Sequence, residues 1–210
     1  PRRIQAAPGR EECGVSQLDL LSKDPIARSA KFVDGCRIEL SRSWGPGPRA
    51  CVIGHNPSAA NGDKDDPTSK WWNRWFNHYG FGGYVAVNLW PFCTASPAEC
   101  HQRVSRVNDG LDWGGRDLIH FVNLPAVVKA AKEAAQVFVC WGGMANDDCW
   151  IEHLIDEIQT GVEPYPDLWC WGTTRAGAPK HPMARGHHRI DPLQAPILWR
   201  RGHEAEAVRA

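Results

Sequence analysis

Four short apolar segments, each ending at or just before a glycine or a polar residue, limit the folds available to this chain more than any other feature. They span residues 49–53, 84–88, 137–142 and 168–171. An apolar run of this length that leads into a loop is typical of a parallel strand buried on both faces. Segments with helical signals lie between the runs, as crossovers between parallel strands require. We therefore predict an α/β fold with a central, mainly parallel, four-stranded sheet flanked by helices.

Local signals predict the helices and the domain bounds. Pro67, Thr68 and Ser69 are start signals for a helix through residues 71–76. A second helix is expected over about residues 125–135, and residues 148–159 have the i, i+3, i+4, i+7 apolar spacing of a third. A strand near residues 36–40 would lead into the sheet. We expect an N-terminal arm over residues 1–35 and a single three-layer domain over residues 36–210, since 210 residues suffice for one buried core.

The composition is that of a folded protein without membrane segments. Hydrophobic residues make up 42% of the chain and charged residues 23%, which is ordinary for a globular domain. The apolar runs are too short to cross a bilayer, and no apolar signal core follows the first arginines. We expect a monomer that stays in the cytoplasm and binds no membrane.

The eight cysteines are expected to be reduced. No pair has Cys-x-x-Cys spacing, so the usual start of a zinc or iron–sulfur site is missing. Cys140 and Cys170 fall within apolar strands, where a thiol behaves as a small hydrophobe. We predict that both are buried and free, and we expect no cofactor and no metal.

The charges are balanced over the whole chain but not along it. The formal net charge is zero, yet residues 175–201 carry six arginines and lysines and three histidines against one acid, Asp191. Such a segment is typical of a surface that contacts nucleic-acid phosphates. The alternative interpretation is a solvated tail in which arginines cluster by chance.

Polar residues at the strand ends are the first candidates for a ligand site, because open parallel sheets bind ligands where their strands end. The amide of Asn56 could orient a water molecule or a base edge, or it could form an Asx turn. Asn88 ends a buried strand and needs a partner, either a ligand or the backbone. His181 is held extended by Pro182 and could direct its imidazole at a ligand, or it could be a packed or capping histidine.

An acidic loop offers a different kind of site. Asp63, Asp65 and Asp66 lie close together, and Mg²⁺ takes a few carboxylates together with substrate phosphate. Three acids beside Lys64 are also typical of a solvated loop. No phosphate-binding Walker loop, no Gly-x-Ser-x-Gly elbow and no His-Glu-x-x-His motif occurs in the chain, which excludes the enzyme classes that these motifs define.

Several short motifs resemble one known family. They are Asn56-Pro57-Ser58-Ala59-Ala60, Asp65-Asp66-Pro67-Thr68, the glycines of 80–83, Val87-Asn88-Leu89, Thr94, Pro97, Trp141-Gly142 and Gly177 through Lys180-His181-Pro182. Together they resemble domain-of-unknown-function family 1643 over about residues 40 to 200. Ala59 and Met183 depart from the usual Thr and larger aliphatic residue, which leaves the finer shape of a pocket open. The resemblance implies no particular reaction.

A second resemblance, to the uracil-DNA glycosylases, does imply a reaction. In the same order, those proteins have a strand ending in Gly-x-Asp/Asn-Pro, a strand ending in Asn, a Trp-Gly exit and a His-Pro loop. The resemblance implies that Asn56 positions the attacking water, that Asn88 reads the pyrimidine edge and that His181 stabilises the leaving base. The other substrate-binding residues that it suggests are Gly54, His55, Pro57, Ser58, Asp66, Trp72, Trp90, Trp141 and Lys180, and the DNA-backbone contacts are Arg175, Arg185 and Arg189.

Three functions are therefore kept open. The leading hypothesis is a DNA glycosylase-like enzyme that excises a uracil-like or modified pyrimidine from DNA. The second is a metal-dependent hydrolase or transferase acting on nucleotides or modified bases through the acidic loop. The third is a non-catalytic reader of modified nucleic acid, because fold-level likeness does not determine function.

Overall fold

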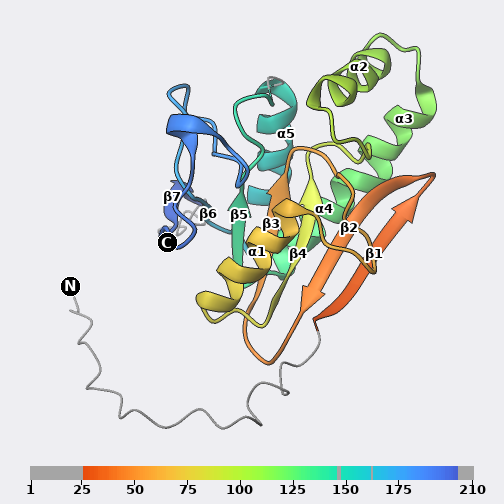
Figure 1. Ribbon diagram of the computed structural model, residues 1–210. Helices are drawn as coiled ribbons and strands as arrows, with labels where there is room; N and C mark the ends of the chain where they lie inside the picture. Colours follow the sequence, from red (N-terminus) through yellow and green to blue (C-terminus); the bar gives the residue numbers. More distant parts are fainter. Residues whose placement is uncertain (1–25, 146–147, 162, 203–210) are drawn as a thin grey trace, which may run out of the picture.

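The computed structural model describes residues 26–145, 148–161 and 163–202, which build helices around one seven-stranded sheet (Figure 1). The strands are β1 (Ala27–Val33), β2 (Cys36–Ser43), β3 (Arg49–Gly54), β4 (Gly83–Asn88), β5 (Gln136–Val139), β6 (Leu168–Cys170) and β7 (Ile197–Arg200). The helices are α1 (Pro67–His78), α2 (Pro97–Asn108), α3 (Trp113–Asp117), the π-helix η1 (Leu118–Asn123), α4 (Leu124–Glu133), α5 (Asp148–Gln159) and the 3-10 helix η2 (Gly186–His188).

The domain is α/β as predicted, but its sheet has seven strands in mixed orientation, so the prediction of a mainly parallel, four-stranded sheet is wrong. Its strand order is β1-β2-β4-β3-β5-β6-β7. The strands formed by the four apolar runs, β3 to β6, are neighbours and pair in parallel. The hairpin β1–β2 extends one edge and β7 extends the other, and all these outer pairs are antiparallel.

The N-terminal arm predicted for residues 1–35 lies only partly within the described residues. Residues 1–25 fall outside them, whereas residues 27–33 form β1 at the edge of the sheet. The approach strand expected near residues 36–40 is β2, which continues to Ser43. The chain therefore enters the sheet within the predicted arm, at residue 27, rather than after residue 35.

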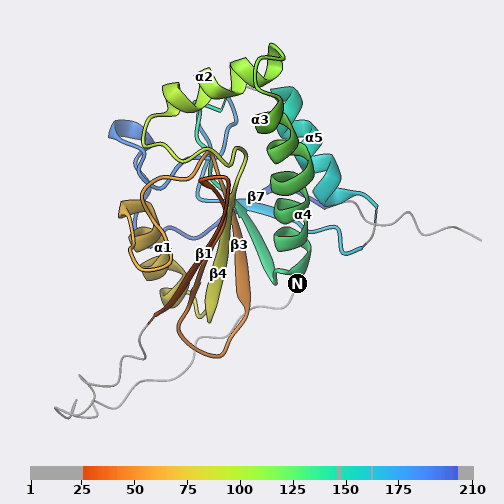
Figure 2. The ribbon, with the colours of Figure 1, turned by 90° about the vertical axis from the view of Figure 1, so that its right-hand side faces the viewer.

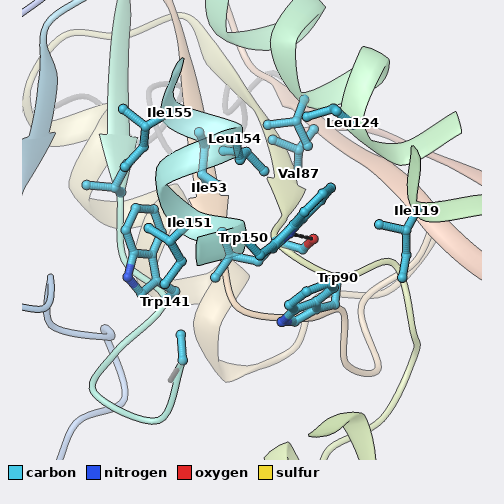
Figure 3. Close-up of a cluster of buried hydrophobic side chains, with 14 of the residues drawn as sticks. Ile53, Val87, Trp90, Ile119, Leu124, Trp141, Trp150, Ile151, Leu154 and Ile155 are labelled. Carbon is cyan, nitrogen blue, oxygen red and sulfur yellow. Dashed lines mark hydrogen bonds between the residues drawn. The ribbon is translucent and has the colours of Figure 1, made fainter. Parts of the chain in front are cut away.

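Apolar side chains of the central strands are buried on both faces of the sheet. Along β3, Ala50 and Val52 belong to the cluster that packs against α1, whereas Cys51 and Ile53 belong to the cluster under α4 and α5. Figure 2 shows the sheet edge-on, with α1 on one side and α3, α4 and α5 on the other. This arrangement explains why the central strands have continuous rather than alternating apolar sequences. Figure 3 shows part of the larger cluster.

Helix α1 begins where the sequence signals predict. Asp66 is its N-cap: the carboxylate accepts the Ser69 backbone N–H, and the Ser69 hydroxyl oxygen accepts the Asp66 backbone N–H. Pro67 occupies the first turn, where no intrahelical partner is needed for a backbone N–H. The helix buries Trp75 and Phe76 against the sheet, which brings its N-terminal end close to the strand exits.

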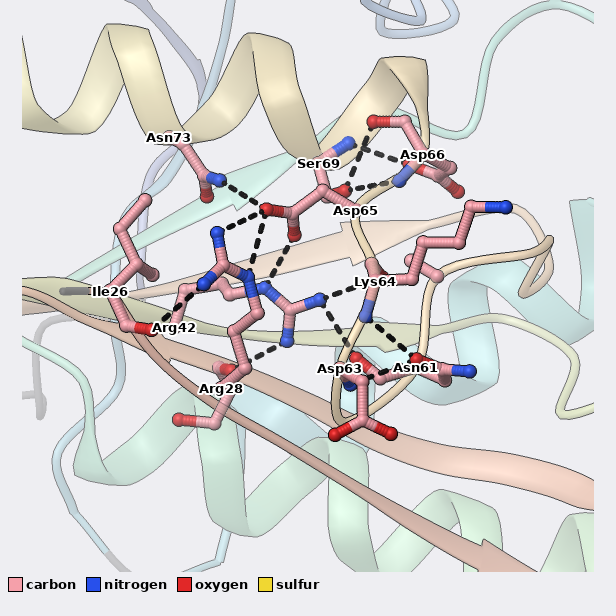
Figure 4. A network of polar contacts seen from close by, with 12 residues as sticks. Ile26, Arg28, Arg42, Asn61, Asp63, Lys64, Asp65, Asp66, Ser69 and Asn73 are labelled. Atoms are coloured by element: carbon pink, nitrogen blue, oxygen red, sulfur yellow. Dashed lines mark hydrogen bonds and ion pairs between the residues drawn. The ribbon is translucent and has the colours of Figure 1, made fainter.

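The acidic loop before α1 is held by one buried carboxylate (Figure 4). Asp65 accepts hydrogen bonds from Arg42 at 2.6 Å, from Arg28 at 3.0 and 3.1 Å, and from the Asn73 amide at 3.1 Å. Burial by itself would raise the pKa of Asp65, but the hydrogen bonds and positive charges of Arg42 and Arg28 outweigh it and lower the pKa. This network ties the loop to β1, β2 and α1.

Cys140 and Cys170 are free and buried, which confirms that prediction. Burial raises the pKa of both thiols, so they stay protonated. Within the part of the chain that the structure describes, none of the helices has the length and apolar character to cross a membrane.

Candidate functional site

A pocket of about 710 Å³ opens at the end of the sheet where the parallel strands finish. This volume lies within the range of small-molecule sites in proteins. The wall is built from five regions far apart in the sequence: β2, the loop after β3 with the start of α1, the loop from β4 to α2, the loop after β5, and the long segment from β6 to η2.

Most of the predicted site residues come together in this pocket. The predicted residues that line it are Gly54, His55, Asn56, Ser58, Asp66, Trp72, Asn88, Trp141, Arg175, Lys180, His181 and Arg185. The exits of β3, β4 and the segment beyond β6 therefore converge as predicted. Carboxyl ends of parallel strands share one edge of a sheet, which is the physical reason for this convergence.

Three predicted residues do not line the pocket. Trp90 is buried in the layer beneath α5, where its ring stacks on Trp150 with centroids 5.3 Å apart (Figure 3). Assigning it to the substrate pocket was wrong, because this position already buries the indole in the core. Pro57 is buried outside the pocket, and its carbonyl accepts from Thr94. Arg189 is exposed at the end of η2, outside the pocket wall.

Backbone hydrogen bonds continue beyond the ends of β3 and β4. Leu89 N–H donates to the Gly54 carbonyl at 2.9 Å, and Trp90 N–H donates to the His55 carbonyl at 3.1 Å. Asn123, on η1, donates its side-chain amide to the carbonyls of Asn88 and Leu89. The two strand exits are therefore held as one rigid unit.

The side chain of Asn56 is fixed by its surroundings. Its Nδ2 donates to the carbonyls of Thr94 at 2.7 Å, Pro57 at 3.0 Å and Phe92 at 3.3 Å. Three acceptors around one terminal atom identify that atom as the nitrogen, so Oδ1 faces His55 Nδ1 at 2.8 Å. Oδ1 accepts this hydrogen bond with one lone pair and keeps the other.

The Asn56 contact also determines the tautomer of His55. Because Oδ1 can only accept, His55 carries its proton on Nδ1, and its Nε2 is left as the acceptor for His101 Nε2 at 3.1 Å. Burial lowers the pKa of His55, with a further lowering from His101, and together they outweigh the hydrogen bond with Asn56, which raises it. A chain of hydrogen bonds thus runs from α2 through both imidazoles to Asn56.

His181 is positioned as an uncharged hydrogen-bond donor. Its Nδ1 accepts the backbone N–H of Met183 at 3.1 Å, so the proton of the neutral ring is on Nε2. Burial lowers the pKa of His181 to about 4, with a further contribution from His55. Gly142, after β5, lies directly against it, because a Cβ added there would be 3.4 Å from His181 Cβ.

Several buried polar atoms of the pocket wall have no hydrogen-bond partner. Among the described residues, these atoms are Asn88 Nδ2, Trp72 Nε1, Arg37 Nε and Thr174 Oγ1. An unpartnered buried donor costs about 1–3 kcal/mol, and such groups in a pocket are natural contacts for a ligand. The sequence prediction included Asn88 and Trp72 but missed Arg37 and Thr174.

One comparison identifies the family. The sequence profile of the family described as "Protein of unknown function (DUF1643)" matches residues 37–183. The chain belongs to this family. No curated protein and no solved structure matches it significantly.

The DUF1643 region begins and ends on pocket residues, Arg37 and Met183. Of the two departures from the usual DUF1643 pattern, Met183 lines the pocket, whereas Ala59 is exposed outside its wall. Arg185 and His188 line the pocket beyond the matched region. The region shared with the family therefore contains most of the pocket.

The acidic loop of this DUF1643 protein is occupied by protein contacts. Asp65 is paired with two arginines and Asp66 caps α1. Within the described ranges, no group of three or more His, Cys, Asp or Glu side chains is arranged to hold a metal ion.

Proposed function

We propose that this protein is a DNA glycosylase-like enzyme that removes a uracil-like or modified pyrimidine by hydrolysing its N-glycosidic bond. One observation carries the proposal: Asn56, Asn88 and His181 line the same pocket, although they come from three separate segments. A base stacked inside a duplex cannot enter such a pocket, so the target nucleotide would be flipped out of the helix.

The proposed reaction gives each of these side chains a task. Water attacks the sugar carbon, and the new C–O bond forms as the C–N bond breaks. The electron pair of the C–N bond leaves with the base, and a proton of the water passes to solvent. The free lone pair of Asn56 Oδ1 would orient the water, while Asn88 Nδ2 would donate to the pyrimidine edge. The Nε2–H of His181 would donate to the carbonyl oxygen on which negative charge develops.

The protonation state of His181 supports this role. A neutral imidazole with its proton on Nε2 can donate a hydrogen bond to a developing oxyanion without transferring a proton to the substrate. Arg175, Lys180 and Arg185 around the pocket would contact DNA phosphates, which supply much of the affinity without reading sequence.

A panel of duplexes, each carrying one modified pyrimidine, tests the proposal. Under single-turnover conditions, wild-type protein should release one base and leave a site that breaks on alkaline treatment. Asn88→Ala should lose this activity, and Asn77→Ala, a change at an exposed asparagine of α1, should keep it. Binding without base release from any duplex would indicate a non-catalytic reader. Loss of activity on chelation would instead favour the metal-dependent alternative.

A further inference from the structure

Arg37 is a buried arginine of the pocket wall that forms no ion pair with any described residue. It is only 3% exposed, and among the described residues no carboxylate forms an ion pair with it. Its Nη1 donates to the Ala60 carbonyl at 2.7 Å, whereas Nε has no partner. Burial of a guanidinium without an ion pair is unfavourable, and burial lowers the pKa of Arg37, an effect that the charge of Asp66 only partly offsets.

Arg42, on the same strand, shows that the fold can neutralise a buried arginine. It is fully buried, and its guanidinium is paired with Asp65 and donates to the carbonyls of Ser41, Asn61 and Lys64. The two arginines differ in position, because Arg37 lines the pocket and Arg42 does not. The lack of an ion pair at Arg37 is therefore a feature of the pocket.

Other donors of the pocket wall also lack partners. Trp72 Nε1 and Asn88 Nδ2 are buried and unpaired. Both side chains adjoin Gly54, since a Cβ added there would be 3.0 Å from Asn88 Oδ1 and 4.0 Å from Trp72 Cη2. Because these groups and Arg37 Nε are all N–H donors, the ligand that satisfies them must supply acceptors.

The charges of the pocket wall also favour an anionic ligand. Among the described residues, Arg37, Arg175, Lys180 and Arg185 line the pocket together with one acid, Asp66. The Asp66 Oδ1 atom already accepts the Ser69 backbone N–H at the start of α1. The charged lining of the pocket is thus predominantly positive.

We infer that the ligand carries a negatively charged oxygen group, a carboxylate or a phosphate, which binds inside the pocket at Arg37 beside the donors of Trp72 and Asn88. The pyrimidine part of this ligand rests on the function proposed above. A base with an acidic substituent would bring a carboxylate, and a mononucleotide would bring a phosphate. The 710 Å³ of the pocket are more than a single pyrimidine ring fills, so either group has room.

Calorimetric titration with two matched pairs of probes tests the inference. Uracil is compared with 5-carboxyuracil, and uridine with uridine 5′-monophosphate, at constant ionic strength. The acidic member of one pair should bind at least about ten times more tightly than its neutral partner, a difference of about 1.4 kcal/mol. The pair that shows the preference identifies the source of the anion. Equal affinities within both pairs would overturn the inference.

Variants then test whether Arg37 holds the anion. Arg37→Gln should abolish the preference and Arg37→Lys should keep most of it, while Arg74→Gln, at an exposed arginine outside the wall, should leave it unchanged. A preference that survives Arg37→Gln would assign the anion to the other cations and overturn the inference. If Arg37→Gln fails to fold, Trp72→Phe provides a second test, because it removes the Nε1 donor but keeps an aromatic ring, and it should weaken binding of the acidic probe several-fold.

These measurements need no catalysis, so they separate the inference from the proposed reaction. An Arg37-dependent preference for the acidic probe in a protein that releases no base would overturn the glycosylase proposal alone. Base release without any such preference would overturn the anion site alone.

Discussion

The amide of Asn56 holds the pocket loop as well as facing the pocket. Its three backbone acceptors lie on the loops after β3 and β4. Asn56→Ala would leave these carbonyls without this donor, so we expect a loss of about 1–3 kcal/mol of unfolding free energy, besides slower turnover. Urea unfolding measures it, with Asn77→Ala as the exposed control. A variant as stable as wild type would show that these hydrogen bonds contribute nothing.

His181 should make the stability of the protein depend on pH. Its pKa is about 4 in the folded protein and about 6.5 in an unfolded chain. Between these values the unfolded state binds a proton that the folded state does not, so stability falls as the pH is lowered from about 6.5 to 4. Compared with His181→Gln, wild type should lose more unfolding free energy between pH 7.5 and 4.5. A parallel decline in both proteins would contradict a neutral imidazole at His181 in the folded protein.

His181 also has a separate kinetic prediction. Removing one preorganised donor to a developing oxyanion typically costs about 10²–10³ in rate. Single-turnover base release by His181→Ala should fall by this amount while DNA binding persists. His187→Ala, at an exposed histidine of η2, should match wild type. A catalytic role for His181 would be ruled out by an unchanged rate in His181→Ala.

Asp65 should stabilise the fold and should not bind a metal ion. Its removal would leave the Arg42 guanidinium, which is fully buried, without its counter-charge. Breaking a buried pair in this way costs about 3–5 kcal/mol, so Asp65→Asn should be strongly destabilised and Asp63→Asn, at an exposed position, should not. Thermal unfolding compares them, and a rise in wild-type stability on adding Mg²⁺ would point back to a metal site.

At the level of the elements, the close packing of the ends of β3 and β4 positions the Asn88 side chain in the pocket wall. A Cβ at Gly54 would lie 3.0 Å from Asn88 Oδ1, so Gly54→Ala should displace the Asn88 amide. We expect it to weaken ligand binding more than it lowers stability, as seen by calorimetry and thermal unfolding. Gly62→Ala, whose Cβ would meet only ordinary contacts, is the matched control and should bind normally.

The elements that could be predicted from the sequence are those whose apolar pattern by itself indicates which side chains are buried. β3 to β6, α1 and α5 have continuous apolar runs or clear helical spacing, and the helix expected at about residues 125–135 and the strand expected near residues 36–40 correspond to α4 and β2. β1 could not be recognised, because most of its side chains are exposed. Arg37 alternates with apolar residues along β2 and so indicates a solvent-facing position. It is buried because the loop around Ala60 covers it, which no strand pattern reveals.

For the whole molecule, the formal net charge of zero hides a positive pocket. DNA binding should therefore weaken steeply with salt, because each phosphate contact releases counterions. Arg185→Ala should flatten the slope of log affinity against log salt by about one unit. Lys129→Ala, on the exposed face of α4, should keep the wild-type slope, and the same slope in Arg185→Ala would place the DNA elsewhere.

The wide spacing of the pocket segments has a consequence for the growing polypeptide on the ribosome. Arg37 leaves the ribosome before β3 to β7, whereas His181 and Arg185 emerge only after nearly all of the sheet has been made. Because domains generally fold as units, a nascent chain that has completed β5 still lacks one wall of the pocket. Ligand binding can therefore stabilise the domain only after the segment from β6 to η2 has been synthesised.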